Sequence, residues 1–314
     1  MRPVLPQHQP LLIDQAACPY AVIGKQAQYC ENLPGAPSAL AATPGNAQIG
    51  LTWTAASGAT AYNVHRGTAS GGPYTTIQTN VFGTSFTNTG LTNGVTYYYV
   101  VTATNGVGEG PNSNEASATP VTPPTVVTFT SVAAQDGWVL ESSETTNVGG
   151  SIDANAATTS ALRVGDNNQD RQYKSVVSFD TSSIPDGATT LSANLRLRRG
   201  TLSGTSPFTT HGTCWVDVSN GGFSGSTTLQ TGDFQAAATA VQAASLSNAA
   251  SNGAWSEGTL NAAGLAAVTK TGTTQFRVYF NLDDNDDTGN DYLGYYSGDN
   301  STSANRPQLV VTYQ

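Results

Sequence analysis

The chain has 314 residues, a formal net charge of −9 at pH 7 and a charged fraction of only 11%. Its few basic residues are scattered, which argues against nucleic-acid binding, because neutralising phosphates needs a basic patch. No apolar run approaches the length of a membrane span. A surface rich in Gly, Thr, Ser, Ala and Asn is typical of secreted β proteins and predicts an extracellular or cell-surface location, a virion surface included.

Residues 1–36 are predicted to form an extended arm, punctuated by five prolines. Three interpretations remain open: the arm is a fragment of an upstream domain, it packs on the second domain of its own chain, or it adds a strand to a neighbouring subunit and drives self-association. The first residues lack the charged and apolar regions of a signal peptide. A removed signal, a longer parent chain or another route out of the cell would each explain that.

Cysteines are sparse. Cys18 and Cys30 lie in the arm and are predicted to close a small disulfide ring in an oxidising compartment. Cys214 lies in a strand pattern, TCWVDV, and is predicted to be a small core residue.

Residues 37–120 have the pattern of a β-sandwich, with about seven short strands and turn signals every eight to twelve residues. The segments IGLTW, SGATAYNVHRG and GLTNGVTYYYVVTATNGVGEGPNSN resemble a fibronectin type III domain. In this resemblance Trp53 stands at the core tryptophan, and Leu91 and Tyr97 form the tyrosine corner, whose hydroxyl bonds back to the loop. The resemblance implies a rigid spacer or adhesive module.

A proline-rich linker is predicted over residues 121–129, where Pro123 and Pro124 favour an extended backbone. Residues 130–314 then give about eight to ten strands with apolar and polar residues in alternation. The helix-like stretches are two Ala-rich segments, DFQAAATAVQAASL and LNAAGLAAVTKTG, and the second predicts a short helix after Asn261. The expected fold is all-β, a fibronectin type III sandwich followed by a jelly-roll-like β-sandwich.

The second segment also resembles a known family. ALRVGDNNQDRQYKSVVSFDTSSIPDGATTLSANLRL and the closing RPQLVVTY are similar to the DNRLRE-type, disaggregatase-related domains, which are classed among carbohydrate-binding modules. The resemblance covers nearly all of residues 130–314. It implies a β-sandwich that binds a glycan or a cell-surface polysaccharide.

An acidic loop follows the strand QFRVYFNL. Its oxygen-bearing side chains are spaced so that they can curl around a hard cation such as Ca²⁺. The predicted ligands of this structural Ca²⁺ are Asp283, Asn285, Asp287 and Asp291. The alternative is a solvated polar loop without a metal.

A glycan platform is predicted just beyond this loop. Tyr295 and Tyr296 are neighbours in a strand, so both cannot face inward, and one must be exposed or at a rim. An exposed tyrosine beside Asp299 and Asn300 combines a ring that stacks on sugars with polar hydrogen-bonding groups. The alternative is a strand-edge tyrosine with no ligand.

Catalytic motifs are missing from the sequence. His8, His65 and His211 lie in separate segments, and there is neither a G-x-S-x-G nor an H-E-x-x-H pattern. The glutamates Glu141, Glu144 and Glu257 are best explained as surface residues, although glycoside cleavage also uses paired acids. The chain is therefore predicted not to be an enzyme.

Three functions fit these features. The first is a non-catalytic extracellular adhesion protein that binds glycans. The second is a structural subunit of a fibre, sheath or virion, joined through the arm. The third is the non-catalytic region of a secreted hydrolase whose catalytic domain lies outside this sequence.

Overall fold

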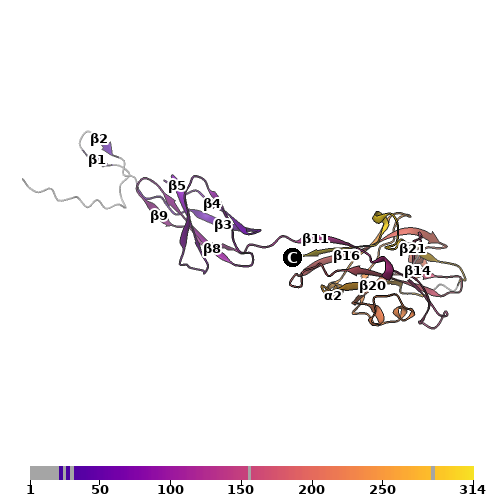
Figure 1. The fold of residues 1–314 in the computed structure, drawn as a ribbon. Helices are drawn as coiled ribbons and strands as arrows, with labels where there is room; N and C mark the ends of the chain where they lie inside the picture. Colours follow the sequence, from indigo (N-terminus) through magenta and orange to yellow (C-terminus); the bar gives the residue numbers. More distant parts are fainter. Residues whose placement is uncertain (1–20, 24–25, 29–31, 155–156, 284–286) are drawn as a thin grey trace, which may run out of the picture. The chain divides into compact units, whose positions relative to one another are not determined.

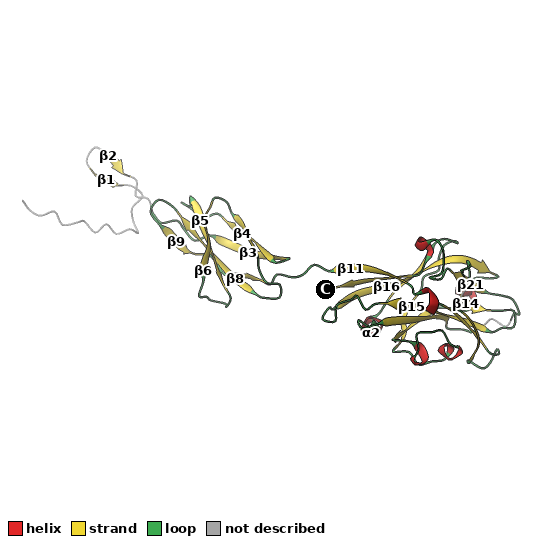
Figure 2. Ribbon diagram, viewed as in Figure 1, coloured by secondary structure: helices red, strands yellow, loops and turns green. Residues whose placement is uncertain are grey.

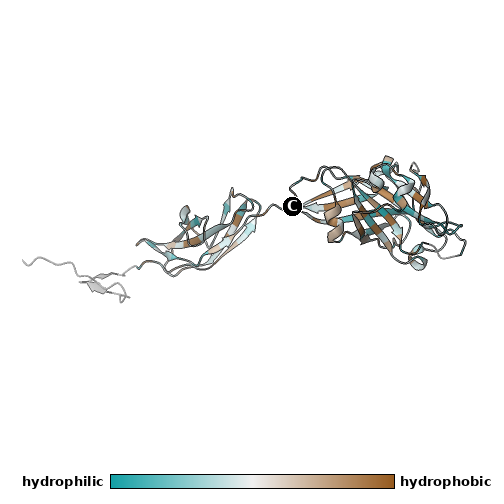
Figure 3. Ribbon diagram, turned by 90° about the horizontal axis from the view of Figure 1, so that it is seen from below, coloured by the Kyte–Doolittle hydropathy of each residue, from teal (hydrophilic) through white to brown (hydrophobic). Residues whose placement is uncertain are grey.

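The computed structural model describes residues 21–23, 26–28, 32–154, 157–283 and 287–314. The chain divides into two compact units, Met1–Pro123 and Pro124–Gln314. Strands dominate both units and the helices are short (Figures 1 and 2). Apolar and polar residues alternate along many of these strands (Figure 3). The predicted all-β class is confirmed.

The first unit contains a short hairpin followed by a sandwich. The hairpin pairs β1 with β2 inside the predicted arm. One sheet of the sandwich has the order β3-β4-β7, and the other has the order β10-β8-β5-β6 with β9 paired to β8. The strands are β1 (Ala21–Ile23), β2 (Gln26–Gln28), β3 (Ser38–Gly45), β4 (Gln48–Thr54), β5 (Ala61–Gly67), β6 (Thr75–Val81), β7 (Ser85–Thr89), β8 (Tyr97–Thr104), β9 (Glu109–Asn112) and β10 (Ala116–Ala118).

The core of this sandwich contains the residues that the sequence singled out. Trp53 and Leu91 are buried. The backbone N–H of Thr92 donates to the hydroxyl oxygen of Tyr97 at 3.2 Å, which confirms the predicted tyrosine corner. This bond satisfies a backbone group next to the β8 strand that would otherwise lack a partner.

The described strands of the second unit form one continuous curled sheet of twelve strands. The main order is β11-β22-β16-β21-β14-β15-β20-β17-β18, with β12 paired to β13 and β15, and β19 paired to β16. The strands are β11 (Thr125–Thr130), β12 (Gly137–Glu141), β13 (Gly149–Asp153), β14 (Leu162–Asp166), β15 (Gln172–Asp180), β16 (Thr190–Ser203), β17 (Cys214–Asn220), β18 (Ala240–Ser245), β19 (Trp255–Thr259), β20 (Thr273–Phe280), β21 (Tyr292–Tyr295) and β22 (Gln308–Tyr313).

Short helices connect these strands. They are the 3₁₀ turns η1 (Ala133–Gln135), η2 (Phe223–Gly225), η3 (Thr231–Phe234) and η4 (Ser303–Asn305), and the helices α1 (Pro207–Thr210) and α2 (Ala262–Ala267). Helix α2 begins after Asn261, as predicted, because the Asn261 side chain accepts the backbone N–H of Gly264 at 3.0 Å and caps the first turn.

Two predictions on this unit were wrong. The linker predicted over 121–129 is too long, since residues from Thr125 onward form β11, which pairs with β22. The Ala-rich stretch that includes Ala240–Ser245 was considered helix-like, but it is strand β18, an edge strand paired with β17. Pairing along a neighbouring strand outweighs the helix propensity of alanine at such a site, because tertiary context overrides local propensity.

The described residues of the second unit form two apolar clusters. The larger cluster lies inside the curled sheet and includes Leu195, Val216, Phe276 and Leu309. The predicted core residue Cys214 belongs to it and is fully buried. A smaller cluster, formed by Val139, Val176, Phe223, Leu229 and Phe234, brings η2 and η3 against β12 and β15.

Candidate functional site

The structure separates the two tyrosines of the predicted glycan platform. Tyr295 is fully buried, and its hydroxyl lies 3.0 Å from the hydroxyl of Ser256 inside the core. Tyr295 was therefore wrongly predicted as a sugar-stacking residue, because no ligand can reach its ring. Tyr296 is half-buried, in line with the alternation argument that one of the pair must lie at a rim.

The polar members of that platform also differ from each other. Asn300 is buried, and its Oδ1 accepts the backbone N–H of Thr302 and the side-chain amide of Asn305, so it holds a turn together. This structural task argues against its predicted contact with a glycan. Asp299 is exposed.

The acidic loop is partly built into the fold. Asp291 is buried, and its Oδ1 accepts the backbone N–H of Thr205 at 2.7 Å. Asp283 and Asp287 are exposed, whereas Asn285 lies outside the described residues. Within the described ranges, no group of three or more His, Cys, Asp or Glu side chains is placed to hold a metal ion. The Ca²⁺ site stays a prediction.

The loop is tied to a second acidic turn, around Asp166 and Asp170, that lies far from it in the sequence. Asp166 Oδ1 accepts the backbone N–H of Asp291, and Asp170 Oδ1 accepts the backbone N–H of Thr288, both at 3.1 Å. These carboxylates therefore have backbone donors for partners.

The histidines and glutamates lie in separate structural settings. His211 and Asp166 are both fully buried, with Nε2 and Oδ1 3.4 Å apart, so a polymer substrate cannot reach them. Glu141 was wrongly predicted to be a surface residue: it is buried and accepts the backbone N–H of Asn147. Glu257 pairs with Arg196 at 2.8 Å. His8 and both predicted disulfide cysteines lie outside the described residues.

Three aromatic rings surround one guanidinium on neighbouring strands. Arg163 of β14 places its guanidinium carbon 5.4 Å from the ring centroid of Trp138, 5.4 Å from that of Tyr173 and 5.0 Å from that of Tyr292. These distances are within cation–π range. The Arg163 Nη1 atom also donates to the Tyr173 hydroxyl at 3.2 Å. We call these four residues the Arg163 cluster.

The backbone register explains how the cluster forms. Gly165 of β14 lies opposite both Tyr173 of β15 and Tyr292 of β21, and the two tyrosine rings meet edge to face at 5.6 Å. Gly165 has a φ of +120°, and a Cβ there would lie 2.1 Å from the carbonyl oxygen of Asp291. Only glycine fits this position, so the close approach of these strands depends on it.

The Arg163 cluster reaches the surface. Trp138, Arg163 and Tyr292 are half-buried, and Tyr173 beneath them is buried. None of these four residues belongs to the glycan platform that was predicted from the sequence, which consisted of Tyr295, Tyr296, Asp299 and Asn300. The half-buried aromatic residues of this unit include Trp138, Trp215, Trp255, Tyr292 and Tyr296. A partly exposed aromatic surface with an arginine donor is suited to stacking on a sugar ring and hydrogen-bonding its hydroxyls.

A second tryptophan has arginine neighbours elsewhere on the unit. The ring of Trp255 on β19 lies 4.6 Å from the guanidinium carbon of Arg196 and 5.7 Å from that of Arg198. Arg196 is engaged by Glu257, and Arg198 donates to the carbonyls of Gly253 and Ala304, so these arginines already have protein partners.

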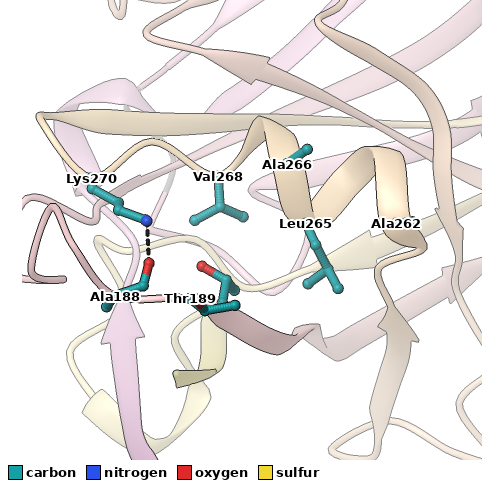
Figure 4. A pocket seen from close by; sticks show the side chains of 8 residues that line it. Ala188, Thr189, Ala262, Leu265, Ala266, Val268 and Lys270 are labelled. Carbon is teal, nitrogen blue, oxygen red and sulfur yellow. Dashed lines mark hydrogen bonds between the residues drawn. The ribbon is translucent and has the colours of Figure 1, made fainter. Parts of the chain in front are cut away.

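A cavity of about 450 Å³ lies beside helix α2 (Figure 4). Leu265 and Val268 point into it, and Lys270 reaches across to donate to the backbone oxygen of Ala188 (Figure 4). Apart from Lys270 and the hydroxyls of Thr189 and Thr190, its lining is apolar. It offers few groups that could recognise a polar ligand.

Comparison with known proteins identifies the first unit. Residues 35–119 match the family model of the fibronectin type III domain, and this segment is such a domain. The assignment agrees with the sandwich and the tyrosine corner described above. In the part of the chain that the structure describes, no helix is long and apolar enough to cross a membrane.

Segments of large enzymes are similar to part of this chain. The amylopullulanase of Thermoanaerobacterium saccharolyticum is 39% identical over 106 residues, which are 34% of this chain and 7% of that protein. The amylopullulanase of Thermoanaerobacterium thermosulfurigenes is 41% identical over 91 residues, 29% of this chain and 5% of that protein. The chain thus matches only a small part of these relatives.

Among solved structures, an Fn3-like protein from Clostridium thermocellum is 44% identical to the matched segment, with a TM-score of 0.27. The match covers 29% of this chain and 98% of the Fn3-like protein. The resemblance of the second unit to DNRLRE-type domains stays a prediction.

Proposed function

We propose that this chain is a non-catalytic, glycan-binding region of an extracellular polysaccharide hydrolase, with the fibronectin type III domain as its spacer. The relatives support the hydrolase context, because segments 39–41% identical to this chain occur in amylopullulanases. Among the three functions considered above, they favour the third. Glycan binding is the part that the first function shares with it.

The Arg163 cluster is the observation that carries glycan binding. Its half-buried rings come from β12 and β21, and Arg163 is fixed between them by its contacts with three aromatic rings. A rigid site loses little conformational freedom when it binds a ligand. Sugar C–H groups would stack on Trp138 and Tyr292, while free N–H groups of Arg163 would bind hydroxyls.

Affinity electrophoresis of the full chain in gels that contain pullulan tests this proposal. Because an aromatic contact contributes about 1 kcal/mol, we expect Tyr292→Ala to raise the Kd about three- to tenfold. Trp255→Ala is the matched control, since it removes a half-buried aromatic residue with arginine neighbours elsewhere. Retardation that is equal in wild type and Tyr292→Ala would refute the assignment, and weaker retardation of Trp255→Ala alone would move the site to β19.

A further inference from the structure

A polar pocket lies on the other side of strand β15 from the Arg163 cluster. Tyr173 belongs to the cluster and Lys174 lines the pocket, and consecutive residues of a strand point to opposite faces. The pocket measures about 300 Å³. Its polar lining residues are Asn147, Gln172, Lys174, Tyr279, Asn281 and Asp283.

Lys174 is held rigidly at the wall of the pocket. Its Nζ lies 3.3 Å from Asn147 Oδ1, 3.4 Å from the backbone oxygen of Phe234 and 3.9 Å from the centroid of the Phe234 ring. An ammonium group has three N–H donors, so these two hydrogen bonds leave one donor for a ligand. Burial lowers the pKa of Lys174 to about 8, so the group still carries its proton at neutral pH.

The aromatic wall is fixed as well. The Tyr279 hydroxyl donates to Asp217 Oδ1 at 3.1 Å, which holds the half-buried ring in place. Gln172 is anchored through its Nε2, which donates to the backbone oxygens of Phe280 and Leu282. Its Oε1 accepts no hydrogen bond from the described residues and remains as an acceptor at the pocket wall.

These groups specify the chemistry of a ligand. An ammonium donor, amides and a carboxylate acceptor in one small cavity match a molecule whose neighbouring hydroxyls both donate and accept. Asp283 at the pocket and exposed Asp287 nearby in the sequence disfavour an anionic ligand. A cavity of about 300 Å³ is at the lower end of ligand-site volumes, so it suits the end of a chain better than its interior.

We call this cavity, lined by Lys174, Gln172, Tyr279 and Asp283 among others, the Lys174 pocket. We propose that the Lys174 pocket binds the terminal residue of an uncharged glycan chain, as a second binding site distinct from the Arg163 cluster. Its ligand class rests on the proposed function, whereas its position and its selectivity for chain ends do not. Binding at the two sites should scale differently. Stacking on the Arg163 cluster depends on the mass of polymer present, whereas binding in the Lys174 pocket depends on the number of chain ends.

Calorimetric titration of the full chain with two pullulan preparations, which differ about tenfold in mean chain length, measures this difference. For an end-binding site, we expect the affinity per gram to rise about tenfold with the shorter preparation. Asp283→Asn, at an exposed position, should weaken binding of the short chains several-fold. Asp186→Asn, another exposed acid but outside the pocket, is the matched control and should change nothing.

The outcomes separate the two proposals. The pocket assignment would be overturned if the affinity per gram is the same for both pullulan preparations, falls in Tyr292→Ala and is unchanged in Asp283→Asn. The proposed function would still stand in that case. The pocket would be supported, and the Arg163 cluster overturned, if the affinity per gram rises with the number of chain ends and falls in Asp283→Asn but is unchanged in Tyr292→Ala. Preference for oligosaccharides of uronic acids would overturn the uncharged ligand. Absence of binding to pullulan and to a panel of other uncharged glycans would overturn both sites.

Discussion

The second unit contains a buried ion pair between Arg277 and Asp217. Arg277 alternates with apolar residues in QFRVYFNL, yet it is buried and pairs with buried Asp217. Arg277 Nη1 also donates to the backbone oxygens of Asp233 and Ala236. The arginine thereby fastens the segment around η3 onto β20.

Removing one member of this pair should cost much more than breaking a surface pair. Asp217→Asn leaves the guanidinium of Arg277 buried without its counter-charge, and we expect a loss of about 3 kcal/mol in the free energy of unfolding. Glu257→Gln, which breaks the partly exposed pair with Arg196, should cost about 1 kcal/mol or less. Urea unfolding followed by tryptophan fluorescence compares the two, and equal losses would contradict the role assigned to Arg277.

A second prediction at this scale concerns pH. Burial raises the pKa of Asp136 to about 7, although its oxygens accept the backbone N–H groups of Ser178 and Gly298. The folded state therefore holds this proton more tightly than the unfolded state. The contribution of Asp136 to stability is present in full below about pH 4 and is lost as the pH rises to about 7, at about 1.4 kcal/mol per pH unit.

Asp136→Asn cannot titrate, so the gap in unfolding free energy between wild type and variant should narrow from pH 4.5 to pH 7. The variant also loses an acceptor oxygen, which lowers its stability by an amount that does not depend on pH. Chemical denaturation at several pH values measures the gap. A gap that stays constant would show that Asp136 is ionised throughout.

Among the elements, β16 joins the two parts of the curled sheet. Residues 190–198 pair with β19 and β22, and residues 199–203 pair with β21. The register shifts between Arg199 and Thr201. Gly200 lies at this bulge, where a Cβ would come within 2.0 Å of the backbone oxygen of Thr159. The strand can pass from one part of the sheet to the other because this position has no side chain.

Gly200→Ala should therefore destabilise the second unit by about 1–3 kcal/mol, because a backbone carbonyl cannot move aside as a flexible side chain would. Gly187→Ala is the control: nothing lies within 4 Å of its Cβ, and we expect a change within about 1 kcal/mol, towards higher stability. Thermal unfolding monitored by circular dichroism gives both values. A tolerated alanine at Gly200 would mean that the segment around Thr159 shifts freely.

For the whole molecule, two units with separate apolar clusters imply two folding transitions. The sandwich core gathers residues between Leu40 and Ala103, and the clusters of the second unit gather residues from Phe129 onward. We expect calorimetry of the full chain to resolve two transitions, and the separate segments 32–123 and 124–314 each to reproduce one of them. A single transition that disappears when the chain is divided would contradict independent folding.

The same calorimetric experiment tests the predicted Ca²⁺ site. If a cation neutralises the acidic loop, a chelator should lower the Tm of the second unit alone, because a ligand bound only to the folded state stabilises it. The first unit serves as an internal control. Unchanged transitions together with no metal by elemental analysis would remove the Ca²⁺ hypothesis.

Several features could be predicted from the sequence because they depend on near neighbours. Alternating residues predicted the β class and Asn261 predicted the start of α2, whereas the tyrosine corner of Leu91 and Tyr97 was implied by the resemblance to fibronectin type III domains. Part of the candidate site could also be predicted, since Trp138 and Tyr292 are aromatic residues of the type that stacks on sugars. Arg163 was not, because nothing local connects it with rings on three other strands.

The sequence by itself determined the alternating period of most strands, and with it the fact that Tyr295 and Tyr296 face opposite ways. Tertiary structure alone decided that Tyr295 is the inner one, that Arg277 is covered by the η3 segment, and that β18 is a strand. The reason is physical: alternation sets two faces, but distant segments of the chain decide which face is covered.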